Sequence, residues 1–255
     1  MTDIKKYKTA LVLSGGGCRG FAHLGALKAL NEKGIFPDVI SGTSAGAIVA
    51  ALYADGRTPD EIMLFFKEKE LLKYVEMIIP KTGLVKMTGI IKLFNKYLKA
   101  KTFEDLKIPI FICASNLNTG KSEYFSKGEL LKPIIASASI PVLFSPVKIN
   151  DSHYVDGGLM DNFPIKIVHG LAEKIIGVYV CPVCFKENFS SIKSIAIRSF
   201  YLAISKNVDI ESPLCDLFIA PEKLNQYGIL EVKKNEEIFK LGYTETKKLL
   251  KTHIF

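Results

Sequence analysis

Ser44 lies in the pentapeptide GTSAG, where a short apolar stretch at residues 38–41 meets a second apolar run of helical composition. A serine between two glycines at a strand-to-helix turn is typical of the nucleophile in acyl-transfer chemistry. Gly42 and Gly46 have no Cβ atom, so strand and helix can approach closely around a strained serine. At a helix N-terminus, unpaired N–H groups would favour negative charge developing near the hydroxyl. A close-packed turn without chemistry has the same composition, so other segments must decide.

Two other segments could place polar groups beside this serine. A glycine-rich loop at residues 15–20, GGGCRG, follows a strand-like stretch and precedes a helical pattern, so its backbone N–H groups can face a phosphate or an oxyanion. Asp156 ends the strand-like residues 153–155 and precedes Gly157 and Gly158, which permit a close approach to its carboxylate. Asp-Gly is also the commonest hairpin turn, and turn formation alone would account for this pair.

In this order the three segments resemble the patatin-like phospholipase family, whose motifs are a G-G-G-x-R/K-G loop, a G-x-S-x-G turn and a later D-G-G/A. Flanking sequences that also read like family segments lie at residues 19–27, 136–144 and 156–164, and the resemblance covers about residues 8–180. It implies a Ser-Asp dyad with Ser44 as nucleophile and Asp156 as the base. Ester hydrolysis would then proceed through an acyl-enzyme.

The resemblance also implies roles for the glycine loop. The oxyanion hole would consist of backbone N–H groups drawn from Gly15, Gly16, Gly17 and Cys18. Arg19 could contact a substrate phosphate or anchor the loop electrostatically, and its planar guanidinium suits either role. No chemistry is expected from the Cys18 side chain, although its surroundings could lower the pKa of the thiol and make it oxidisable.

A Ser-His-Asp triad is the alternative to a dyad, and the chain has four histidines for it. The usual α/β-hydrolase order puts the histidine after the acid, which leaves His169 or His253. His169 is expected near a helix C-terminus and His253 in a solvated terminal helix. His23 and His153 flank the predicted site, and we interpret both as structural.

Length and composition favour one α/β domain over residues 1–255, because 48% hydrophobic residues can fill a large core. Short, nearly all-apolar runs alternate with helical patterns, as expected for strands covered by helices on both faces. These runs lie at residues 11–13, 110–114, 175–180 and 217–220. We expect a three-layer α/β/α sandwich with a mostly parallel mixed sheet, similar to the patatin fold.

Cysteine usage and hydropathy indicate a cytoplasmic protein. Five cysteines do not suggest a disulfide framework, and the longest uncharged run, residues 39–54, is shorter than a membrane span. We see no signal peptide. Cys181 and Cys184 form one C-x-x-C pair with no second pair and no nearby histidine, so we predict neither a metal site nor another cofactor, and the role of this pair stays open.

A net charge of +8 favours anionic partners, and lipid suits the motifs better than nucleic acid because no nucleic-acid-binding module is recognisable. Solubility alone could also account for the charge. Residues 60–101 mix lysines with large apolar side chains, as in helices that lie on a bilayer or form a lid, or in two ordinary core helices. Residues 192–204 are apolar nearly all round, which indicates a buried or acyl-lining helix, and residues 233–251 alternate charges as on a solvated face.

Nucleotide binding is the main rival function, because the loop at residues 15–20 also satisfies G-x-G-x-x-G. A dinucleotide site requires an acidic residue at the end of the second strand to bind the ribose, where this chain has Ser41 to Ser44 instead. A non-catalytic lipid-binding relative would not need an intact Ser44 and Asp156. We therefore predict a peripherally membrane-associating acyl hydrolase of phospholipid or lysophospholipid esters, with a soluble esterase or thioesterase as the alternative.

Overall fold

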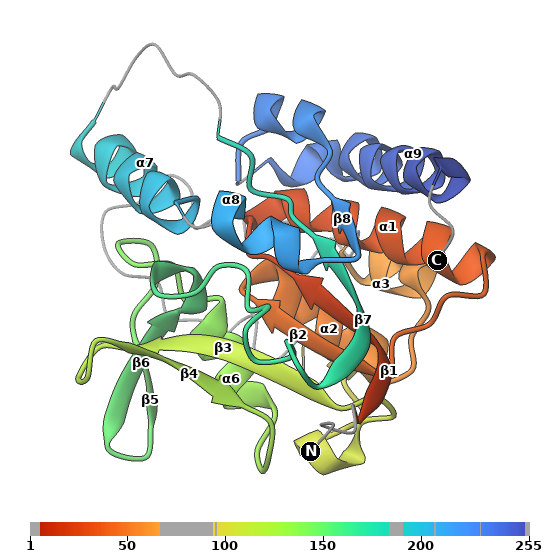
Figure 1. Ribbon diagram of the computed structural model, residues 1–255. Coiled ribbons are helices and arrows are strands. Elements are labelled where there is room, and N and C mark those ends of the chain that lie inside the picture. The colour runs from red at the N-terminus through yellow and green to blue at the C-terminus, as the bar shows by residue number, and fades with distance from the viewer. Residues whose placement is uncertain are drawn as a thin grey trace.

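The strands of the computed structural model form an eight-stranded mixed sheet with helices on both faces (Figure 1). The structure describes residues 6–66, 94, 96–183, 191–206, 208–229 and 231–252. The strands are β1 Tyr7–Leu13, β2 Val39–Thr43, β3 Ile110–Asn116, β4 Lys121–Phe125, β5 Val147–Ile149, β6 Ser152–Asp156, β7 Ala172–Val178 and β8 Leu217–Ile219. Their order is β5-β6-β3-β2-β1-β7-β8, with β4 also paired to β3. Strands β8, β7, β1, β2 and β3 are parallel neighbours, whereas β4, β5 and β6 pair antiparallel.

Helices cover the two faces of this sheet, as the alternation of apolar runs predicted. They are α1 Phe21–Glu32, α2 Ala45–Ala54, α3 Pro59–Phe66, α6 Leu131–Ser137, α7 Ile192–Ile204, α8 Val208–Glu211 and α9 Asn235–Thr252. Strand β1 contributes to both cores: Leu11 belongs to the core with α1 and α2, whereas Val12 belongs to a second core with Phe163 and Tyr201. Because side chains alternate across a strand, burial on both faces requires the continuous apolar run seen in β1.

The register of β3 brings β2 and β6 together end to end. Thr43 at the end of β2 pairs with Cys113, and Asp156 at the end of β6 pairs with the next residue, Ala114. Strand β4 overlaps both pairings, from Ile112 to Asn116. Because a strand has only two edges, β2 and β6 must share the other edge of β3 and run toward each other. The residue after β2 therefore meets the last residue of β6.

Helix α9 has a packed face that its alternating charges did not predict. Every fourth residue of α9 is buried, including Ile238 and Leu250, and the helix lies along α1. A Cβ atom on Gly242 would lie 2.0 Å from the carbonyl oxygen of Ala22, and one on Gly25 would lie 2.0 Å from that of Phe239. Only glycine allows this approach, so the prediction of a solvated face holds for the opposite side of α9 alone.

The basic, apolar region at residues 60–101 begins as part of the core. Ile62 and Met63 of α3 are buried, and the rings of Phe66 and Phe21 meet edge to face with centroids 5.2 Å apart. Residues 67–93 lie outside the described residues, so their predicted lid or membrane contact stays a prediction. Among the described helices, none is both long and apolar enough to cross a bilayer.

Candidate active site

Ser44 occupies the turn between β2 and α2 in a strained conformation. Its φ of 53° and ψ of −119° lie where residues other than glycine are rare. A Cβ on Gly46 would lie 2.2 Å from the Leu13 carbonyl oxygen, and one on Gly42 would lie 2.7 Å from the Gly46 carbonyl, so both glycines permit the sharp turn. The Ser44 backbone N–H donates to the Ser137 hydroxyl over 2.8 Å. This hydrogen bond helps to hold the serine in its strained backbone conformation.

Asp156 lies within hydrogen-bonding distance of the serine. Ser44 Oγ donates to Asp156 Oδ2 over 2.6 Å, and the Gly158 N–H donates to Asp156 Oδ1 over 2.8 Å. Both side chains are buried. Burial raises the pKa of Asp156 to about 7, although the hydrogen bonds from Ser44 and Gly158 oppose the shift. A carboxylate with this pKa is a far better proton acceptor at neutral pH than an ordinary aspartate.

No described histidine side chain forms a hydrogen bond with this serine or this aspartate. His23 is fully buried, its Nε2 lies 2.8 Å from the Ser14 carbonyl oxygen, and burial lowers its pKa to about 4. It therefore stays neutral at pH 7 and holds the strand end that leads into the glycine loop. His153 is exposed on β6, and His169 lies in a turn instead of the predicted helix. His253 lies outside the described residues.

The glycine loop has two free backbone donors. The Gly15 N–H donates to the Asn162 carbonyl over 3.2 Å, and the Cys18 N–H donates to the Ile229 carbonyl over 2.8 Å. The N–H groups of Gly16 and Gly17 have no hydrogen-bond partner among the described residues. Gly17 has a φ of 58°, and a Cβ there would lie 2.3 Å from the Ile229 carbonyl oxygen. Of the four donors predicted from the sequence, Gly16 and Gly17 are thus the two available to an oxyanion.

Arg19 makes its contacts inside the protein. Its Nε donates to the Tyr227 carbonyl over 2.8 Å, and its Nη1 donates to the Pro182 carbonyl over 3.1 Å and to the Tyr201 hydroxyl. The guanidinium carbon also lies 5.0 Å from the centroid of the Tyr201 ring, in a cation–π contact. The side chain is buried. Of the two roles left open by the sequence, these contacts favour anchoring of the loop over contact with a substrate phosphate.

Cys18 corrects one sequence-based expectation. The thiol pKa is not lowered: burial, with a smaller contribution from the charge of Glu231, raises it to about 12. A thiol that stays protonated at neutral pH is a poor target for oxidation. Burial likewise raises the pKa of Cys181 to about 11, and Cys184 lies outside the described residues. The described cysteines are free thiols.

A small pocket of about 10 Å³ lies above Ser44, beneath helix α7. Its walls include Ser44, Asp156, residues 15–17 and Asn162, and α7 closes it with Phe200, Tyr201 and Ile204. This volume holds about one water molecule. Asn162, which lines this pocket, and Ser137, whose hydroxyl accepts the Ser44 N–H, also belong to the site, although sequence reasoning gave neither a role. Both residues lie in family-like segments, Asn162 at 156–164 and Ser137 at 136–144, which was the available signal. Their contacts with the site could not be predicted, because the Ser137 hydroxyl meets the Ser44 N–H across 93 positions of sequence.

A strained serine at the end of a parallel strand, on a mixed α/β sheet, is the architecture of serine acyl hydrolases. The model of the family described as patatin-like phospholipase matches residues 11–169. The chain therefore belongs to the patatin-like phospholipase family, and the resemblance inferred from the three motifs is confirmed.

Similar proteins support this assignment, and the matches cover different fractions of their length. A lysophospholipase of Aspergillus fumigatus is 28% identical over 278 residues, which cover 94% of this chain and 18% of that relative. An uncharacterized NTE family protein of Mycobacterium bovis is 32% identical over 167 residues, 64% of this chain and 46% of the relative. VipD from Legionella pneumophila shares the fold, with a TM-score of 0.58 and 17% identity over 97% of this chain and 67% of VipD. The chain thus spans about a fifth of the length of the Aspergillus relative.

Proposed function

We propose that the protein is a lipid acyl hydrolase that uses Ser44 as nucleophile and Asp156 as general base. The observation that carries this proposal is the 2.6 Å hydrogen bond from Ser44 Oγ to a buried carboxylate with a pKa of about 7. Ser44 Oγ attacks the ester carbonyl while its proton passes to Asp156. The N–H groups of Gly16 and Gly17 stabilise the oxyanion. Asp156 then protonates the departing alcohol, which leaves an acyl-enzyme on Ser44.

Phospholipid or lysophospholipid esters are the proposed substrates. The family match and the lysophospholipase among the relatives support a lipid ester over a soluble ester or thioester. The decisive experiment measures fatty acid release from mixed phospholipid and lysophospholipid vesicles by the purified protein. Release that requires Ser44 supports the proposal and ranks the two lipids. Hydrolysis of soluble esters or thioesters alone would favour the second candidate function.

The pH profile should report the titration of Asp156. The carboxylate must be ionised to accept the serine proton, so kcat/KM on a non-titrating soluble ester is expected to reach a plateau above pH 7. Below pH 7 it should fall about tenfold per pH unit, to roughly one hundredth of the plateau at pH 5. An activity that stays constant from pH 5 to pH 8 would contradict Asp156 as the base.

Arg19→Ala is expected to lower hydrolysis of phosphate-bearing and neutral esters by the same factor, and to lower Tm. The substitution removes three contacts that join the glycine loop to Pro182, Tyr201 and Tyr227. Arg19→Lys should fail to restore activity, because an ammonium cannot reproduce the guanidinium fork. Parallel assays on a lysophospholipid and a neutral monoacyl ester test this expectation. A selective loss on the phosphate-bearing ester would instead support direct phosphate contact.

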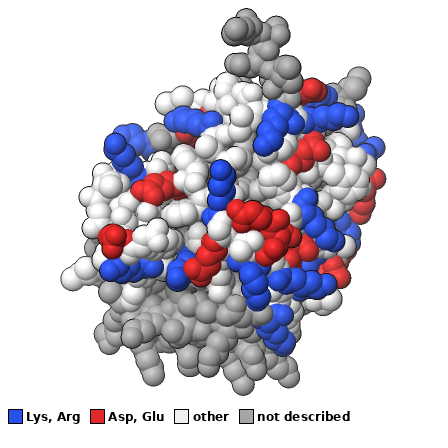
Figure 2. Space-filling model, turned by 90° about the horizontal axis from the view of Figure 1, so that it is seen from below, with Lys and Arg blue, Asp and Glu red and all other residues white. Residues whose placement is uncertain are grey.

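We also propose that α7 meets the lipid surface. Helix α7 carries Phe200, Tyr201 and Ile204 over the Ser44 pocket, while Ile192, Ile195 and Leu202 are exposed. One apolar face of α7 covers a pocket that holds about one water molecule, and the other is exposed. Such a helix can enter a bilayer with its exposed face and thereby uncover the serine. Figure 2 shows basic and acidic residues interspersed on another face of the protein, without a single basic patch. The exposed apolar side chains of α7 are therefore the observation on which this proposal rests.

Ile195→Asp and Leu202→Asp are expected to reduce hydrolysis of vesicle lipids at least tenfold and to leave hydrolysis of a short soluble ester within about twofold. Ile195 is 51% exposed, so the change should not disturb the core. Phe36→Asp is the matched control, because Phe36 is 57% exposed and lies before β2, at the end of the strand opposite to Ser44. Vesicle cosedimentation measures binding directly. Equal losses in all three variants would contradict α7 as the lipid contact.

A further inference from the structure

The Asn162 side chain lies in the wall between the Ser44 pocket and a larger neighbouring pocket. It is 6% exposed, and neither its Oδ1 nor its Nδ2 has a hydrogen-bond partner among the described residues. The Asn162 side chain lies close enough to the Cys181 thiol to lower the pKa of that thiol slightly, but sulfur is a weak hydrogen-bonding group and neither amide atom lies in the geometry of a hydrogen bond. Buried amides nearly always take their hydrogen bonds from protein or from water. This amide is therefore available to bind water or a reacting group.

The amide lies beside both members of the dyad. A Cβ built on Gly15 would lie 2.4 Å from Asn162 Oδ1 and 3.1 Å from Ser44 Cβ. A Cβ built on Gly158 would lie 2.9 Å from Asn162 Oδ1 and 3.0 Å from Asp156 Oδ1. Asn162 Oδ1 thus lies near Gly15 together with the Ser44 side chain, and near Gly158 together with the Asp156 side chain. The main chain fixes the position of Asn162, because its carbonyl oxygen accepts the Gly15 N–H.

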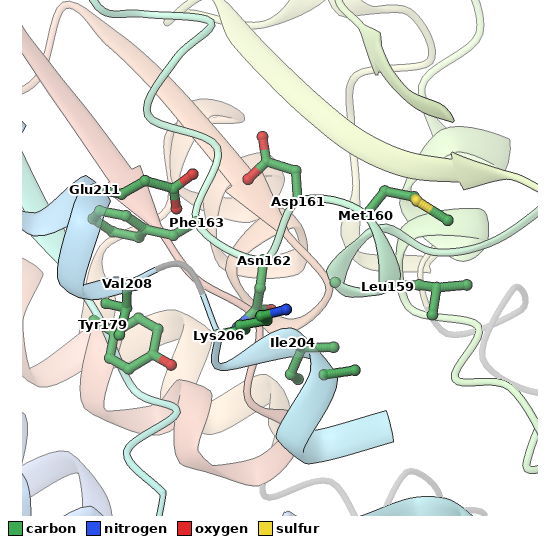
Figure 3. A pocket seen from close by; sticks show the side chains of 12 residues that line it. Leu159, Met160, Asp161, Asn162, Phe163, Tyr179, Ile204, Lys206, Val208 and Glu211 are labelled. Carbon is green, nitrogen blue, oxygen red and sulfur yellow. The ribbon is translucent and has the colours of Figure 1, made fainter. Parts of the chain in front are cut away.

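The neighbouring pocket is polar and large enough for water. Its volume is about 70 Å³, against about 10 Å³ for the Ser44 pocket, and one water molecule needs roughly 10–15 Å³. Figure 3 shows Asn162 between Asp161 and Glu211 on one side and Ile204 and Lys206 on the other. Asp161 Oδ1 is a second buried atom without a described partner. Several water molecules therefore fit in this pocket beside Asn162, within reach of polar groups in its wall.

We propose that Asn162 orients the water that cleaves the acyl-enzyme, with the neighbouring pocket as the source of that water. The inference rests on the proposed function, because it concerns the second half of the same reaction. During that half the acyl carbonyl group bonded to Ser44 Oγ takes up the space of the small pocket, which has room for only about one water molecule, so the attacking water must arrive through another wall. Asn162 and Ile204 line both pockets, and of these two only Asn162 offers hydrogen bonds.

The step balances in atoms and charge. The water oxygen bonds to the acyl carbonyl carbon while one water proton passes to the Asp156 carboxylate. The tetrahedral intermediate then collapses, the bond from carbon to Ser44 Oγ breaks, and the proton on Asp156 returns to Oγ. Free fatty acid leaves, and the dyad regains its starting state. The Asn162 amide exchanges no proton, so it is a positioning residue.

The test measures acylation and deacylation separately in the purified protein. Asn162→Leu keeps the branched skeleton and the number of side-chain heavy atoms without polar atoms, and Asn162→Ala removes the amide with little steric demand. Stopped-flow hydrolysis of a p-nitrophenyl acyl ester should show a burst of about one product per enzyme at a rate within about threefold of wild type. Steady-state turnover should fall at least tenfold, and intact-protein mass should show acylated Ser44. Hydroxylamine, a stronger nucleophile than water, should restore turnover.

Two controls test whether the effect of the Asn162 variants is specific to deacylation. Labelling of Ser44 by a fluorophosphonate should proceed within about threefold of the wild-type rate, which shows that nucleophile and oxyanion donors are intact. Asn225→Leu, at an exposed amide outside both pockets, should leave every rate unchanged. Equal losses of burst rate, labelling and turnover in both Asn162 variants, or no loss at all, would overturn the inference. A wild-type protein that is never acylated would overturn the proposed function itself.

Discussion

Ser44→Ala is expected to abolish fatty acid release, with kcat/KM at least about 10⁴-fold below wild type. Among the hydroxyls of the described residues, only Ser44 Oγ donates to the Asp156 carboxylate, and the covalent intermediate forms on this oxygen in the proposed reaction. The backbone hydrogen bond from residue 44 to Ser137 does not use the lost hydroxyl, so the turn should persist. Fatty acid release from vesicles and fluorophosphonate labelling measure the loss.

Ser139→Ala provides the matched control for this experiment. Ser139 is another fully buried serine, and its hydroxyl donates to the Ile135 carbonyl over 2.7 Å instead of to the dyad. Its removal should leave activity within about threefold and should not affect labelling. Fatty acid release that survives in Ser44→Ala would mean that another group is the nucleophile.

Asp156→Asn should lower kcat/KM by about 10³-fold or more, because an amide cannot accept the serine proton. The substitution nearly preserves shape, and an amide oxygen can still accept the Gly158 N–H. The loss should therefore appear in turnover and in fluorophosphonate labelling, without loss of the folded state. Turnover near the wild-type level would exclude Asp156 as the base.

The same substitution should stabilise the protein in a pH-dependent way. Burial raises the folded-state pKa of Asp156 above its unfolded value of about 3.9. A raised carboxyl pKa contributes stability below pH 4 that is lost as the pH rises through about 7, whereas asparagine does not titrate. The free energy of unfolding of Asp156→Asn, relative to that of wild type, should thus increase by on the order of 4 kcal/mol as the pH rises from 4 to 8. Urea unfolding of both proteins at pH 4 and pH 8 measures this change. A stabilisation of the variant that is equally large at pH 4 and pH 8 would contradict burial of the charged carboxylate as its cause.

Short stretches of sequence predicted those features of the protein that depend on neighbouring residues. The glycines around Ser44 predicted the strand-to-helix turn because only residues without a Cβ permit the close approach. The continuous apolar run of β1 predicted a strand buried on both faces. From these runs and the three motifs, the mixed α/β fold and the family followed, and both are confirmed.

The hydrogen bond between Ser44 and Asp156 depended on tertiary structure. These residues are 112 positions apart, and they meet because β2 and β6 share one edge of β3, a register that no local pattern specifies. Burial of the carboxylate, which sets its pKa near 7, also comes from packing around it.

The sequence by itself determined which side chains could do chemistry, because glycine spacing and apolar runs act over a few residues. Tertiary structure decided what each one faces. It placed the Arg19 side chain against Tyr201 and Tyr227, behind the lining of the Ser44 pocket, and it raised the pKa of Cys18 through burial. It also put the unpaired Asn162 amide beside the dyad. Hydrogen bonds and desolvation depend on atoms brought together from distant segments, and those distances are fixed only when the sheet and its helices pack.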